Sequence, residues 1–71
     1  MEIDLEAFAE RLKKLRIGRN LTVVQVSNRA MVPQPSLSQW ENARNWPGAV
    51  NLYRLAKFYG VSVDFLLGLE E

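Results

Sequence analysis

The sequence predicts an all-α domain of five short helices, and three features of its 71 residues lead to this prediction. Apolar residues recur every three or four positions, which is the spacing of one face of an α-helix. Glycines and prolines divide this pattern into short segments. Residues that commonly cap the first turn of a helix stand at several of the divisions.

The first helix is expected over residues 4–17, with Asp4 as its N-cap and Gly18 as the start of the break that follows it. The fourth is expected over residues 49–59, after a break at Trp46 and Pro47, and Gly60 ends it. The fifth begins after the cap Ser62. The apolar face of the first helix is formed by Leu5, Phe8, Leu12 and Leu15, and that of the fourth by Leu52, Leu55, Ala56 and Tyr59.

Residues 22–42 predict two short helices joined by a tight turn, with the helices at 22–30 and 35–42 and the turn at 31–34. Thr22 and Gln25 have the spacing of a capping box, and Pro35 suits the first position of a helix. Ser27 is small enough to let the two helices cross closely at a steep angle. These segments therefore predict a helix-turn-helix, whose inward apolar residues are Val26, Ala30, Val32, Leu37 and Trp40.

Composition limits what this chain can do. Residues 1–71 are expected to form a single domain, near the size at which one core supplies only about 3–5 kcal/mol of stability. Cysteine and histidine are absent, which removes thiol chemistry and the usual metal ligands and proton shuttles. We therefore expect no catalytic residue, no metal and no cofactor. No apolar run reaches the length of a membrane span, so a cytoplasmic protein without a membrane partner is expected.

Three segments make the chain resemble the phage repressor and Cro type of helix-turn-helix domain, also called the XRE type. They are FAERLKKLR in the first helix, SQWEN at the end of the third, and YRLAKFYGVSVDFLLG over the last two. The resemblance covers nearly the whole chain. It implies a five-helix lambda-repressor-like DNA-binding domain that acts as a small phage or prophage regulator of transcription and binds double-stranded DNA.

The resemblance also implies which residues contact DNA. Gln34 and Gln39 match positions at which related repressors place glutamine on bases, and a glutamine amide can bond adenine through N6 and N7. Asn42, Arg44 and Asn45 match positions that usually touch phosphate or reach towards the minor groove. The predicted DNA-binding residues are Gln34, Ser36, Ser38, Gln39, Asn42, Arg44, Arg16 and Arg19. No arginine or lysine lies between Arg29 and Arg44, so the third helix lacks the common arginine contact to guanine.

Charge is low overall, at +1, but unevenly distributed. Residues 11–19 contain five basic residues and no acid: Arg11, Lys13, Lys14, Arg16 and Arg19. These either face a phosphate backbone or are solvated side chains favourably placed near a helix C-terminus. The resemblance gives Arg16 a second role, because the equivalent arginine of such repressors pairs with a glutamate that here is Glu41.

Four residues depart from the pattern of the resembling repressors. Val23 replaces a glutamine that holds phosphate, and Met31 replaces a turn glycine in the left-handed conformation. Pro33 replaces a serine or threonine cap, and Pro35 a base-reading residue. The third helix is therefore expected either to begin late or to have its N-terminal end aimed differently.

These departures support an alternative function, in which the chain is an anti-repressor that binds a partner repressor protein. An apolar patch on the altered face would then form the contact, because exposed tryptophan, methionine and similar residues are favoured at interfaces. Its predicted members are Val23, Val24, Met31, Pro33, Pro35 and Trp46, whereas Trp40 is expected in the core. Leu67 and Leu69 are expected either to form a weak homodimer contact or to close the core.

Overall fold

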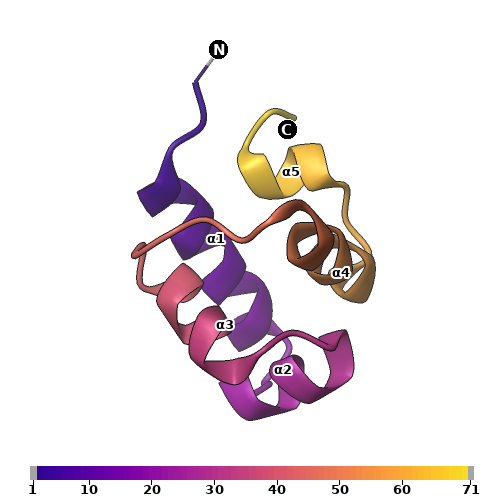
Figure 1. Ribbon diagram of the computed structural model, residues 1–71. Coiled ribbons are helices and arrows are strands. Elements are labelled where there is room, and N and C mark those ends of the chain that lie inside the picture. The colour runs from indigo at the N-terminus through magenta and orange to yellow at the C-terminus, as the bar shows by residue number, and fades with distance from the viewer. Residues whose placement is uncertain (1, 71) are drawn as a thin grey trace.

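The computed structural model describes residues 2–70, and this part of the chain forms five α-helices (Figure 1). They are α1 (Leu5–Gly18), α2 (Val23–Ala30), α3 (Gln34–Glu41), α4 (Ala49–Tyr59) and α5 (Val63–Leu67). The predicted all-α fold class is confirmed, and each helix boundary for which a number was expected lies within one residue of it. In particular, α3 does not begin late: it starts at Gln34, one residue before the expected position.

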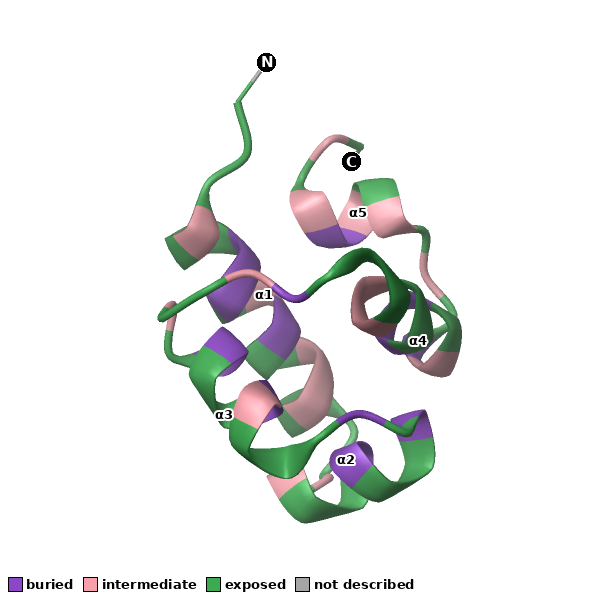
Figure 2. Cartoon of the chain, in the orientation of Figure 1, coloured by how far each residue is buried: buried purple, intermediate pink, exposed green. Residues whose placement is uncertain are grey.

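The core lies where the five helices meet, and every helix contributes to it. In Figure 2 the buried segments face inward while the outer faces of the helices are exposed. The core residues with no exposed surface are Phe8, Leu12, Val26, Leu37, Leu55 and Leu66. Truncating one buried leucine costs about 2–5 kcal/mol. The loss of a single side chain of this kind is therefore comparable with the whole free energy of unfolding expected of so small a domain.

Side chains cap three of the helices at their N-termini. The Asp4 carboxylate accepts from two backbone N–H groups at the start of α1, at 2.9 and 3.2 Å. Thr22 and Gln25 form the predicted capping box at α2, since each side chain accepts from the other residue's backbone N–H, at 3.1 and 2.9 Å. Ser62 accepts from the N–H of Phe65 at 2.9 Å. In contrast, α3 follows Pro33 and has no side-chain cap.

The turn between α2 and α3 has the usual left-handed conformation although Met31 occupies it, with φ 63° and ψ 45°. Three hydrogen bonds hold it there. The N–H of Met31 donates to the carbonyl of Ser27. The buried Ser27 hydroxyl donates to the carbonyl of Val32 at 2.8 Å. From α4, the Arg54 guanidinium donates to the carbonyl of Met31 at 2.9 Å.

We predict that replacing Met31 with glycine stabilises the domain. The Cβ of a residue in the left-handed region costs about 1–2 kcal/mol, part of which glycine's greater freedom in the unfolded chain offsets. Little packing is lost because Met31 is 70% exposed. A net gain near 1 kcal/mol would raise the melting temperature by roughly 4–8 °C. Thermal unfolding followed by circular dichroism measures this, with Met31→Ala as the control that keeps the Cβ. Equal melting temperatures for the two variants would contradict the prediction.

Candidate nucleic-acid interface

The outer face of α3 is polar and exposed, while its inner face is buried. Leu37 and Trp40 lie in the core, as predicted, and Glu41 is buried with them. Five of the remaining residues of the helix and its C-cap are exposed: Gln34, Pro35, Ser38, Gln39 and Asn42. Ser36 is only half-buried and lies at the flank of this face. The structure therefore brings four of the predicted α3 contacts, Gln34, Ser38, Gln39 and Asn42, to one surface.

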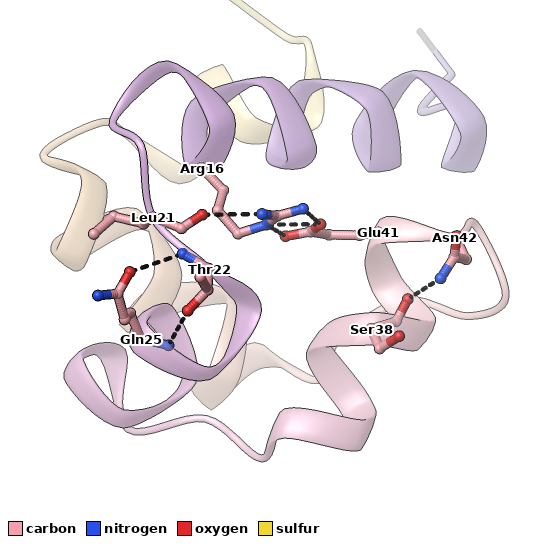
Figure 3. Close-up of polar contacts among 7 residues, drawn as sticks. All are labelled: Arg16, Leu21, Thr22, Gln25, Ser38, Glu41 and Asn42. Carbon is pink, nitrogen blue, oxygen red and sulfur yellow. Dashed lines mark hydrogen bonds and ion pairs between the residues drawn. The ribbon is translucent and has the colours of Figure 1, made fainter.

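An ion pair between Arg16 and Glu41 fixes α3 against α1 (Figure 3). The Arg16 Nε donates to both Glu41 carboxylate oxygens, at 3.0 and 2.9 Å, and Nη2 donates to Oε1 at 2.9 Å. Nη1 donates to the carbonyl of Leu21 at 3.0 Å, so the same guanidinium also holds the loop before α2. The hydrogen bonds to Glu41 raise the pKa of Arg16. With side chains only 14% and 4% exposed, the pair supports the interface from within.

Three basic residues of α1 and the loop after it bind separate partners within the protein. Arg11 donates to the carbonyl of Leu66 at the C-terminal end of α5. Lys14 pairs with Glu10 at 2.9 Å on the exposed side of α1. Arg19 donates to the carbonyl of Tyr59 at 2.6 Å and stacks its guanidinium 5.1 Å from that ring. These internal contacts involve no DNA, so the phosphate-backbone interpretation of this segment stays a prediction, and Arg19 interacts with the end of α4.

Tyr59 lies beside these charges but inside the core. It is 2% exposed, and among residues 2–70 its hydroxyl has no hydrogen-bond partner. Burial, together with the nearby Glu41 carboxylate, raises the pKa of Tyr59 to about 12. The phenol therefore remains neutral at physiological pH and adds no charge behind the α3 surface.

The loop after α3 folds back onto that helix. Ala43 is left-handed, with φ 57°, and the N–H groups of Ala43 and Arg44 donate to the carbonyls of Trp40 and Gln39 at 3.2 and 3.0 Å. This is the Schellman arrangement with alanine in place of glycine. It places Asn45 beside the helix, where its amide donates to Gln39 Oε1 at 2.9 Å. The Asn42 amide donates to the carbonyl of Ser38 at 2.8 Å (Figure 3).

The predicted apolar patch for a protein partner is only partly present. Two of its members pack inward: Val23 contacts the core, and Trp46 lies with its ring centroid 5.0 Å from that of Phe8. Because both side chains are partly buried, this packing gives no support to their contact with a partner, which stays a prediction. The others are exposed: Val24, Met31, Pro33 and Pro35. Leu67 also packs against the core, which favours core closure over a dimer contact for that residue.

Two contacts that support the interface could not be predicted from the sequence. Arg54 reaches Met31 across 23 residues of sequence, and Asn45 reaches Gln39 from a loop whose shape depends on the left-handed Ala43. No local pattern signals either contact, since both depend on tertiary packing or on an unusual backbone angle at an ordinary residue. Among residues 2–70, no helix is long and apolar enough to cross a membrane, and no group of acidic side chains could hold a metal ion.

Comparison with known proteins agrees with this geometry. The sequence pattern of the helix-turn-helix family matches residues 12–66. The chain belongs to this family. It is similar to the HTH-type transcriptional activator BcrR of Enterococcus faecalis, with 38% identity over 64 residues, or 90% of this chain and 31% of that protein. It is also similar to the regulator DdrOP3 of Deinococcus deserti, with 39% identity over 62 residues, or 86% of this chain and 48% of that protein.

The chain therefore spans about a third to a half of the length of these two curated relatives. Among solved structures, the P22 c2 repressor bound to a synthetic operator is similar, with TM-score 0.82 and 27% identity over 89% of this chain and 96% of that one. The restriction-modification controller C.AhdI of Aeromonas hydrophila shares the fold, with TM-score 0.81 and 22% identity over 89% of this chain and 96% of that one. The predicted phage-repressor type of helix-turn-helix domain is thereby confirmed.

We predict that Glu41→Gln strongly destabilises this helix-turn-helix domain. The neutral amide leaves the buried Arg16 charge without its counter-charge, and breaking a buried pair in this way costs about 3–5 kcal/mol. That loss would unfold much of the protein, which urea titration can measure. Glu10→Gln is the matched control: it removes the exposed partner of Lys14 and should leave the urea midpoint unchanged. A Glu41→Gln midpoint equal to that of the wild type would contradict the prediction.

Proposed function

We propose that this helix-turn-helix protein regulates transcription by binding operator DNA, with α3 placed in the major groove. The observation that carries the proposal is the exposed polar face of α3 on a fixed support. An α-helix fits the roughly 12 Å width of the major groove, where base edges can be distinguished by their hydrogen-bond donors and acceptors. The Arg16–Glu41 pair and the Ser27 hydrogen bond hold that helix in place before DNA arrives.

In this proposal the exposed α3 side chains read bases and the loop positions the protein. Gln34, Ser38 and Gln39 face the base edges, with Ser36 at the flank. Asn42 and Arg44 contact the backbone. Arg44 suits that role because it is exposed and, within residues 2–70, its guanidinium makes no hydrogen bond or ion pair. Arg16 acts indirectly, by fixing α3, and Arg19 by holding the end of α4.

The relatives support the proposal at the level of function class. BcrR and DdrOP3 are described as transcriptional regulators, and the similar P22 c2 repressor was solved on an operator. The alternative function, an anti-repressor that binds a partner repressor, has less support because Val23 and Trp46 are partly buried against the core instead of fully exposed in the surface patch. A palindromic operator would indicate that two copies bind together as a weak homodimer.

The test is selection from a randomised duplex library, followed by fluorescence anisotropy on the selected and on unrelated duplexes. We expect Gln39→Ala to weaken binding to the selected duplex by about 1–3 kcal/mol and to leave binding to unrelated duplexes unchanged, because only a base contact is lost. Asn28→Ala, on the exposed side of α2, is the control and should bind both like the wild type. Equal wild-type affinity for selected and unrelated duplexes would overturn the proposed function.

Arg44→Ala should behave in the opposite way. A lost phosphate contact weakens binding to all duplexes alike and lowers the slope of log K against log salt by about 0.9. Titrations at several salt concentrations on both duplexes measure this. An unchanged slope would remove Arg44 from the backbone contacts while leaving the role of α3 intact.

A further inference from the structure

Gln39 differs from the other α3 residues proposed to read bases. Within residues 2–70, it is the one whose side chain accepts a hydrogen bond from a side chain outside the helix. Asn45 Nδ2 donates to Gln39 Oε1 at 2.9 Å, and the Arg44 N–H donates to the Gln39 backbone carbonyl at 3.0 Å. Both bonds come from the loop that Ala43 turns back onto α3. Gln39 is therefore fixed at its backbone and at its amide, although its side chain is exposed.

We propose that Asn45 is a positioning residue that sets which base Gln39 reads. This inference rests on the proposed DNA-binding function and deepens it. A free glutamine can turn its amide either way, and it bonds adenine by placing the carbonyl and the NH₂ side by side on the base. Asn45 binds one lone pair of this carbonyl oxygen and holds it towards the loop, which leaves the NH₂ group as the end of the Gln39 amide that faces the groove.

An NH₂ end can only donate, so Gln39 favours a base edge that offers acceptors. Guanine presents two adjacent acceptors in the major groove, N7 and O6, whereas adenine presents one acceptor beside a donor. The expected preference at the base pair below Gln39 is therefore guanine over adenine. This also gives α3 a guanine contact that does not need arginine or lysine, which its exposed face lacks.

The inference predicts a change of base preference from a substitution outside α3. In Asn45→Asp the carboxylate can only accept, so the Gln39 amide turns over, donates to Asp Oδ and presents its carbonyl oxygen instead. Preference at that base pair should change from guanine to a base with a donor, adenine or cytosine, by about fivefold or more. Asn45→Ala frees the amide and should reduce discrimination there without changing it at other positions.

The experiment is duplex selection and anisotropy with the wild type, both Asn45 variants, Gln39→Ala and the double variant Asn45→Asp with Gln39→Ala. The added negative charge alone weakens binding to every sequence, and the double variant measures this effect without Gln39. The inference is supported if the preference change disappears in the double variant. It is overturned if Asn45→Asp leaves base preference unchanged, or if the change persists without Gln39, since Asn45 would then contact DNA itself.

Failure of the two proposals can be told apart. A wild-type protein that prefers no duplex removes the proposed function and this inference with it. A wild type that prefers one duplex, together with Asn45 variants that keep the same preference, removes the inference alone. Circular dichroism melting of each variant shows that the domain remains folded, because an exposed loop bond between two neutral amides contributes little to stability.

Discussion

The buried ion pair between Arg16 and Glu41 determines how this domain is assembled. One guanidinium joins three segments that are separate in sequence: α1, the loop before α2, and the C-terminal end of α3. Taking two charges out of water is expensive, and a well-packed apolar pair could serve stability as well or better. What the pair adds is direction. A bidentate contact between planar groups allows one relative orientation of its helices, whereas an apolar contact tolerates several.

That directional constraint matters because the backbone bonds of the following loop cap only the C-terminal end of α3, and its N-terminal end has little local support. Its N-terminus follows a proline and has no side-chain cap, and its eight residues are too few to be stable alone. Ser27, Arg54 and Met31 supply the remaining support through the turn. Met31 is left-handed, so the turn keeps its geometry although the residue there is not glycine, which adopts this conformation without strain.

The fold could be predicted closely from sequence because helix periodicity, caps and breaks are local signals that agree with one another. For example, Thr22 and Gln25 mark the start of α2, and Gly60 marks the end of α4. Each signal comes from residues that are neighbours in the chain. The site was predictable only in part. The pair of Arg16 with Glu41 was anticipated from resemblance. The basic residues of α1 could not be assigned from spacing, because their partners Leu66 and Tyr59 lie 40 or more residues away. The packing of Trp46 could not be predicted from spacing, because its neighbour Phe8 comes from a distant helix.

Low charge has a consequence for how such a domain would choose its operator. Sequence-blind affinity for DNA comes mainly from phosphate contacts, and here several basic side chains are already engaged within the protein. With a net charge of +1, binding to unrelated sequences should be weak. In the proposed complex the operator is then held mainly by polar contacts to bases, and a contact of this kind is lost when the base is wrong. A DNA-binding domain with few cationic contacts therefore discriminates better between sequences, because it binds unrelated DNA weakly. The quantity that matters in a genome is the ratio of specific to non-specific affinity.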